Sequence, residues 1–226
     1  MIHYHGTPLT PRAKLLEMSG RHFCVSFAHP CDIEICLDIG QSVMLDNGAF
    51  SAFTKGKALN EQGFYDWCEK HLTHPHWAVV PDVIDGSVEL QREKLKPWPF
   101  PKELSAPVWH LGLSIDWLLE LADHWPKICF GSSGEYWQVG SPKWEKRMDE
   151  AFEALCRTRK FLPWIHGMRM LSQSDGKFPL ASADSVNVAR NFKDTGIHPD
   201  VMAARIDARQ PARKWKPSNQ IELGIL

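Results

Sequence analysis

The sequence of 226 residues has no long apolar run and no cysteine pair with the spacing of a redox or metal motif. A membrane-spanning helix needs roughly 20 consecutive apolar residues, so we expect no part of the chain to be embedded in a bilayer. The N-terminus, Met-Ile-His-Tyr-His, lacks the basic and then apolar segments of a signal peptide. The six cysteines have no Cys-x-x-Cys spacing, and we expect free thiols in a reducing cytoplasm.

An excess of charge of one sign is also missing. The formal net charge is -1, which excludes an overall field that would attract a polyanion. Any nucleic-acid partner would therefore be held by a local basic patch. The 43% hydrophobic and 23% charged residues are typical of a globular protein, and the chain is long enough for a single domain with one large core.

Short apolar or β-branched runs alternate along the chain with segments of helical periodicity. Eight runs are strand candidates: residues 2–4, 22–27, 42–45, 77–81, 106–110, 127–130, 162–166 and 180–183. Helices are expected after the N-cap Ser114, from Ser141-Pro142 to residue 157, and near 11–18, 61–72, 86–95 and 185–193. This alternation predicts an α/β fold, a compact TIM-like (β/α)8 barrel over residues 1–195 with a basic tail, 196–226, packed on it. An open doubly wound sheet is the alternative.

Three aspartates, Asp46, Asp82 and Asp184, each follow a short apolar run. An ionised carboxylate is costly to desolvate, so three of them at strand exits suggest one shared polar pocket at the end of the barrel where active sites lie. Each also has a structural explanation. Asp46 begins the turn sequence Asp-Asn-Gly, and Asp82 and Asp184 are placed to cap helices.

Polar or small residues follow three further strand candidates. His110 follows the fifth strand and Met168 the seventh, and the sixth is followed by Gly131, Ser132, Ser133 and Gly134. This loop has neither a Walker nor a GxGxxG pattern, and it suits a phosphate site, a purine-edge contact surface or a plain tight turn. The histidines of segment 71–76 are interrupted by a proline and indicate a solvated helix end, so we expect no metal site.

Basic residues gather near the C-terminus. They are Arg190, Lys193, Arg205, Arg209, Arg213, Lys214 and Lys216, with Trp215 among them. Such a cluster could clamp phosphates and stack a base, and a solvated charged face is the alternative. If the tail folds over the rim of the barrel, it would lie near Asp184.

Several of these segments resemble, in order and approximate spacing from residue 40 to 190, motifs of the tRNA-guanine transglycosylase superfamily. The resemblance is closest to the compact phage-type DNA 7-deazaguanine transglycosylases. Segment 43–50 resembles the family's Asp-Ser-Gly-Gly-Phe motif, and 79–82 the strand that ends in a base-reading aspartate. Segments 108–112, 131–135 and 166–170 resemble the Val-Gln-Gly-Gly strand, the glycine-rich loop and the strand with a base-stacking methionine, and Asp184 matches the nucleophile.

The resemblance implies a pentosyltransferase that exchanges guanine for a 7-deazaguanine such as preQ0. Asp184 would attack C1′ and form a covalent glycosyl-aspartate, and Asp46 would act as general acid and base. Asp82 would accept hydrogen bonds from the guanine N1–H and exocyclic amine. His110, Met168 and the loop 131–134 would bind the other edge and the face of the base.

The sequence departs from the family pattern in two places. His110 replaces the family's usual glutamine, and the Cys-x-Cys-x-x-Cys segment of the zinc subdomain in the tRNA enzymes is missing. Because that subdomain helps to grip tRNA, its loss favours DNA as the partner, and companion proteins that open a duplex are compatible with this. The alternatives are a minimal tRNA enzyme, an N-glycoside hydrolase with water as acceptor, and a non-catalytic nucleic-acid or nucleobase binder. No cofactor is expected.

Overall fold

Parallel strands form a barrel in the computed structural model, which describes residues 1–217. The strands are β1 (Ile2–Gly6), β2 (His22–Ser26), β3 (Ser42–Asp46), β4 (Trp77–Val79), β5 (Ser105–Ala106), β6 (Val108–His110), β7 (Lys127–Gly131), β8 (Trp164–Gly167) and β9 (Ser182–Ser185). Their order in the sheet is β5-β4-β3-β2-β1-β9-β8-β7-β6, and every pair is parallel. The predicted (β/α)8-like barrel is confirmed, and the open sheet is excluded.

Pro107 divides the fifth predicted strand in two. Ala106 in β5 pairs with β4, whereas Val108 in β6 pairs with β7. Proline has no N–H to donate to a ladder, but the Pro107 carbonyl accepts a hydrogen bond from the Cys129 N–H at 2.9 Å. The two edges of the sheet are thus consecutive in the chain, and the barrel is nearly closed at this residue.

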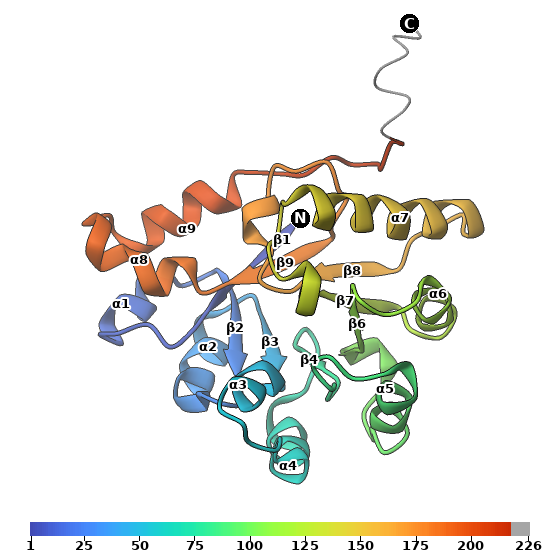
Figure 1. The fold of residues 1–226 in the computed structure, drawn as a ribbon. Coiled ribbons are helices and arrows are strands. Elements are labelled where there is room, and N and C mark those ends of the chain that lie inside the picture. The colour runs from blue at the N-terminus through green and yellow to red at the C-terminus, as the bar shows by residue number, and fades with distance from the viewer. Residues whose placement is uncertain (218–226) are drawn as a thin grey trace, which may run out of the picture.

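Helices surround the strands (Figure 1). Among the described residues they are α1 (Ala13–Leu16), α2 (Ile33–Ile39), α3 (Ala49–Thr54), α4 (Glu61–His71), α5 (Val88–Leu95), α6 (Ile115–His124), α7 (Pro142–Thr158), α8 (Asn187–Thr195) and α9 (Pro199–Asp207). The predicted N-caps are confirmed, because the side chains of Ser114 and Ser141 accept hydrogen bonds from backbone N–H groups three residues on. Sequence periodicity missed α2, α3 and α9. None of the helices within residues 1–217 is long and apolar enough to cross a membrane.

The core has two parts. The large outer part lies between the strands and the helices and contains residues such as Phe23, Trp109 and Phe152. The small inner part fills the barrel, with inward side chains from β1 to β7: Tyr4, Cys24, Met44, Trp77, Val79, Ala106, Val108 and Cys129. The six cysteines are free thiols. Because side chains alternate along a strand, the inward positions can be followed to the rim of the barrel.

The tail does not fold over the rim that carries Asp184, as far as the structure describes it. Gln210 accepts a hydrogen bond from the N-terminal ammonium group of Met1, which directly precedes β1. The Ala212 N–H donates to the Gly176 carbonyl at 2.9 Å, and Trp215 donates to Asp149 of α7 at 3.0 Å. The tail therefore passes the N-terminal end of the barrel, and its residues 218–226 lie outside the described part of the chain.

Candidate active site

Five residues form the last inward-facing layer at the C-terminal end of the barrel. Asp46, His110 and Gly131 each lie two positions beyond an inward residue of the same strand. Met168, just after β8, and Asp184 in β9 lie two positions beyond the buried His166 and Ser182. Two positions along a strand return a side chain to the same face, so these residues point toward one axis. The alternation explains how segments more than 130 residues apart reach the same place.

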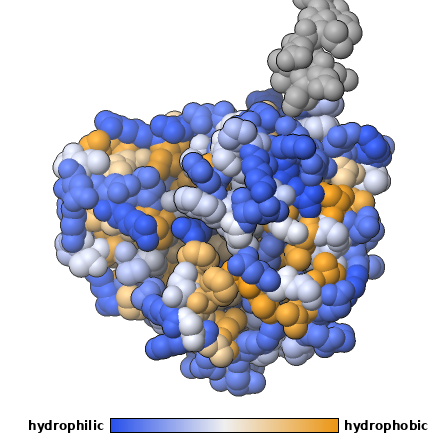
Figure 2. All heavy atoms as spheres, viewed as in Figure 1, coloured by the Kyte–Doolittle hydropathy of each residue, from blue (hydrophilic) through white to orange (hydrophobic). Residues whose placement is uncertain are grey.

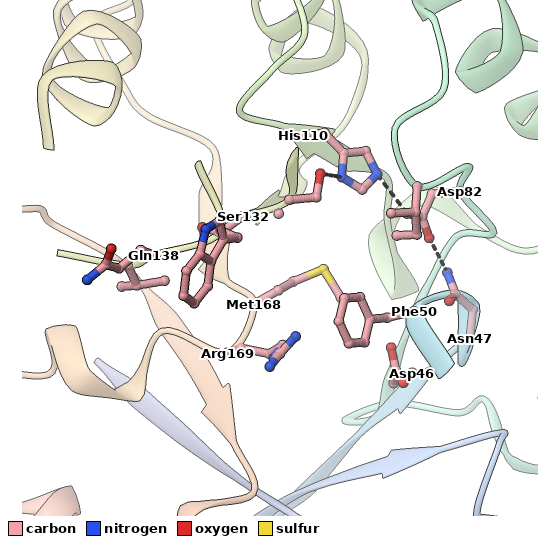
Figure 3. Close-up of a pocket in the computed structure, with 14 residues that line it drawn as sticks. Asp46, Asn47, Phe50, Asp82, His110, Ser132, Gln138, Met168 and Arg169 are labelled. Atoms are coloured by element: carbon pink, nitrogen blue, oxygen red, sulfur yellow. Dashed lines mark hydrogen bonds and ion pairs between the residues drawn. The ribbon is translucent and has the colours of Figure 1, made fainter. Parts of the chain in front are cut away.

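A cavity of about 240 Å³ opens above this layer. It is lined by Asp46, Asn47, Phe50, Asp82, Ile84, His110, Gly131, Ser132, Ser133, Trp137, Gln138, Val139, Met168 and Arg169 (Figure 3). Of the residues predicted to act on or bind a base, all line it except Gly134 and Asp184. Asp184 does not line the cavity, but its carboxylate accepts a hydrogen bond from the backbone N–H of Arg169, which does.

Asp46 combines burial with two neighbouring negative charges. Its carboxylate accepts hydrogen bonds from the Ser26 side chain and the Gly48 backbone, which favour the charged form. Burial is the largest effect, and with the charges of Asp184 and Asp82 it raises the pKa of Asp46 to about 6. A carboxyl group with a pKa near neutrality can donate and recover a proton under ordinary conditions, which is the property that a general acid–base group needs.

A chain of hydrogen bonds holds Asp82. Its Oδ2 lies 2.8 Å from Nε2 of His110, and its Oδ1 accepts from Nδ2 of Asn47 at 2.9 Å. The second ring nitrogen of His110 lies 3.4 Å from the Ser133 hydroxyl. Asp82 and His110 are both buried. Both carboxylate oxygens of Asp82 therefore have protein partners, which the sequence did not indicate, and each oxygen keeps further acceptor capacity.

Gly131 makes room for this chain. A Cβ atom at this position would lie 3.0 Å from Nδ1 of His110 and 3.1 Å from a methyl group of Val108. A larger residue here would require the imidazole or Val108 to shift by a few tenths of an ångström. The predicted small-residue loop thus has a packing reason for its first glycine, independent of any ligand.

Asn47 links the two carboxylates that line the cavity. It follows Asp46 directly, is 1% exposed, and donates to both Asp82 and the Val80 carbonyl while its Oδ1 accepts from the Ala49 N–H at 2.7 Å. The turn sequence Asp-Asn-Gly predicted only a turn at this residue. Its three hydrogen bonds instead make it the residue that fixes where Asp82 lies relative to Asp46.

Replacing Asn47 by alanine should lower the free energy of unfolding by roughly 2 to 4 kcal/mol, since two buried acceptors and one buried N–H lose their partner. Urea unfolding at pH 7 measures this. Asn60→Ala is the matched control, because it removes a single exposed N-cap hydrogen bond that the Asn60 side chain accepts from the Gly63 N–H. It should lower the free energy of unfolding by about 1 kcal/mol. Equal losses in the two variants would contradict a special role for Asn47.

Asp184 is held from two sides. Its Oδ1 accepts from the Arg169 N–H at 2.7 Å and lies 3.2 Å from Nε2 of His166. The His166 ring is fully buried, and its Nδ1 lies 2.8 Å from the Ser182 hydroxyl. Arg169 has a φ of 60°. This left-handed conformation is strained for a non-glycine residue, and such strain gathers at functional sites. Here this conformation turns the Arg169 backbone N–H toward Asp184. The contacts of Asp184 with Arg169 and with His166 both involve the same carboxylate oxygen, Oδ1.

Comparison with protein-family models, with curated proteins and with solved structures finds no match to this chain.

Arg169 and two aromatic residues border the cavity and were not predicted as site residues. The Arg169 guanidinium lies over the Phe50 ring, 4.5 Å from its centroid, and the ring is 43% exposed. Trp137 is 71% exposed. Phe50 and Arg169 lie within the segments that carry the family resemblance, so their positions were a usable signal. Trp137 directly follows a single 3-10 turn, Gly134–Tyr136, and no sequence periodicity indicated it.

The predicted nucleic-acid-binding residues are not brought to this cavity. Arg209, Arg213, Lys214 and Lys216 are exposed on the tail, at or beyond the N-terminal end of the barrel, and Arg205 is exposed on α9. Helix α9 is joined to that end by Arg21, which precedes β2 and bonds to Asp200 and Asp207. Only Arg190, in the first turn of α8, lies close to a strand end at the rim. Within residues 1–217 no group of three or more histidine, cysteine or acidic side chains is arranged to hold a metal ion.

Proposed function

We propose that this protein is a DNA-modifying transglycosylase that exchanges guanine for a 7-deazaguanine such as preQ0. The observation that carries the proposal is the pair of inward carboxylates at the rim, Asp46 and Asp184, in different surroundings. Asp184 is held by two hydrogen bonds to one oxygen, whereas the pKa of Asp46 is raised to about 6. Two carboxyl groups with separate environments are what a nucleophile and an acid–base partner require.

The exchange proceeds through two displacements at the anomeric carbon. In the first, a carboxylate oxygen of Asp184 forms a bond to C1′, the C1′–N9 bond breaks, and its electron pair leaves with guanine. Protonated Asp46 supplies the proton that the departing base takes up. In the second, the deazaguanine gives its proton to Asp46, its nitrogen bonds to C1′, and the ester to Asp184 breaks. Two inversions restore the β configuration.

The cavity offers a base both polar and apolar contacts. Asp82 has acceptor capacity for the N1–H and exocyclic amine of guanine, a donor pair that adenine lacks. Its orientation is fixed in advance by His110 and Asn47, which lowers the entropy lost on binding. Met168 and the Phe50 ring supply apolar surface for the face of the base.

DNA is proposed over tRNA because the sequence has no Cys-x-Cys-x-x-Cys segment from which a zinc subdomain could be built. A base inside a duplex cannot reach a cavity at a strand end, so the reacting nucleotide is single-stranded or flipped out. The test is incubation with labelled 7-deazaguanine and either DNA or tRNA, followed by digestion to nucleosides. Label in deoxynucleosides is the expected result.

Three other outcomes of this assay would overturn the proposal in different ways. Label only in tRNA nucleosides would assign the minimal tRNA enzyme. Free guanine released without incorporation would assign an N-glycoside hydrolase. Tight binding of DNA or base with neither product would indicate a non-catalytic barrel.

A further inference from the structure

A second hollow lies beside the cavity, on the other side of Asn47. It has a volume of about 210 Å³ and is lined mainly by α3 and the loop that follows it, including Ser51, Lys55 and Lys57. Asn47 lines both spaces. A ligand that occupies the cavity and extends along α3 would therefore enter this hollow next.

Cations without acidic partners surround this part of the rim. Within residues 1–217, Lys55, Lys57 and Arg169 have no carboxylate within ion-pair distance, and the Arg169 guanidinium lies over the Phe50 ring. On the other side of the cavity mouth, by contrast, Lys143 is paired with Glu135. Lys55 and Lys57 are both exposed. Their charges are available to an anion from solution.

Aromatic rings accompany these cations. Phe50 and Phe53 project from α3 and are 43% and 51% exposed. In Figure 2 apolar residues lie among hydrophilic ones on the face that carries α3. Surfaces that bind single-stranded nucleic acid typically combine exposed aromatic rings, which stack on bases, with unpaired lysines, which contact phosphates.

We infer that a single-stranded stretch of nucleic acid crosses the rim over α3, with a backbone phosphate in the hollow between Lys55 and Lys57. The inference rests on the proposed function, since it assumes that the reacting base occupies the cavity and that its neighbours leave along α3. It moves the nucleic-acid surface from the basic tail, which passes the opposite end of the barrel, to the side of the active site.

The test compares two double variants that each remove two positive charges. Lys55→Ala/Lys57→Ala changes the inferred surface, and Arg213→Ala/Lys214→Ala changes the tail. Binding of a fluorescein-labelled 12-nucleotide single-stranded DNA is followed by anisotropy between 50 and 200 mM salt. We expect the first variant to bind about tenfold more weakly, with the slope of log K against log salt reduced by about 1. The tail variant should stay within about twofold of the wild type.

A second pair of variants tests the aromatic part of the surface. Phe53→Ala should weaken binding of the same oligonucleotide by roughly 5- to 100-fold, whereas Phe161→Ala, which removes a ring that is 79% exposed in the α7–β8 connection, should not. The residues changed in the two double variants and the two phenylalanine variants are all exposed, so the four variant proteins should fold. Thermal melting checks that they do.

Weaker binding only in the tail variant, equal loss in both double variants, or no binding by the wild type would each overturn the inference. The assay requires no reaction. A protein that binds DNA through α3 but never exchanges a base would contradict the proposed function and leave the binding surface standing, so the two failures are distinguishable.

Discussion

Replacing Asp184 by asparagine is expected to lower the rate of base exchange by about 10⁴-fold or more, the range seen when a catalytic nucleophile is removed. The amide keeps nearly the same shape and can still accept from the Arg169 N–H. It cannot attack C1′ as an anion, because it carries no negative charge. The covalent intermediate should therefore disappear together with exchange, while affinity for DNA stays close to that of the wild type.

The measurement is a denaturation-resistant protein–DNA adduct, trapped before the second base is added and mapped by mass spectrometry. The wild type should carry the sugar on Asp184. Asp194→Asn, an exposed carboxylate on α8, is the matched control and should form the adduct at the normal rate. An adduct in the Asp184→Asn protein, or attachment of the sugar to Asp46 in the wild type, would refute the assignment of the nucleophile.

The second large effect concerns Asp46, whose replacement by asparagine should abolish exchange and yet stabilise the protein at pH 8. The pKa of Asp46 is raised to about 6 by burial and by the charges of Asp184 and Asp82. A free aspartate has a pKa of about 3.9, so the folded chain binds this proton more tightly than the unfolded chain does. Keeping the group charged at pH 8 thus costs the wild type roughly 3 kcal/mol, which the neutral amide avoids.

The sign of the pH dependence follows from the raised pKa. The stabilisation that the proton on Asp46 contributes is fully present below about pH 4 and is lost as the pH rises through 6. Urea unfolding of wild type and Asp46→Asn should therefore give similar free energies at pH 4 and diverge above pH 6. Asp194→Asn should show no such divergence. A variant less stable than the wild type at pH 8 would contradict the burial of a charge at this position.

Activity should depend on pH through the same group and in the same direction, falling as Asp46 loses its proton. In the proposed exchange, removal of guanine needs the protonated form of Asp46, so adduct formation by the wild type should slow as the pH rises above about 6. The stabilised Asp46→Asn protein should form adduct slowly at every pH. This combination of gained stability and lost activity is typical of residues kept for function.

Local patterns of the sequence predicted the barrel strands well because apolar β-branched runs and turn residues act over a few positions. Each of the eight predicted runs overlaps a strand, and the caps at Ser114 and Ser141 form as expected. The fifth run is the exception, because Pro107 divides it into two strands, β5 and β6, that pair with different neighbours. Helix α2 was missed because isoleucines at 33, 35 and 39 obscure the helical period.

Long-range contacts could not be predicted in the same way. Nothing near Asp82 in the sequence indicates that its partners are Asn47 and His110, which lie 35 and 28 residues away. Likewise, the backbone of Arg169 reaches Asp184 only because β8 and β9 are neighbours in the barrel. Such pairs depend on which strands lie side by side, and strand order is a property of the whole fold.

Residue periodicity was enough to place Asp46 and Asp184 on strand ends, because the period of two that buries Met44 and Ser182 also turns these carboxylates inward. Only the tertiary structure showed that the charges of Asp184 and Asp82 raise the pKa of Asp46, and that both oxygens of Asp82 are already hydrogen-bonded. It also showed that the basic tail passes the opposite end of the barrel. Electrostatic interaction and desolvation depend on distances in space, and a linear pattern of residues does not contain those distances.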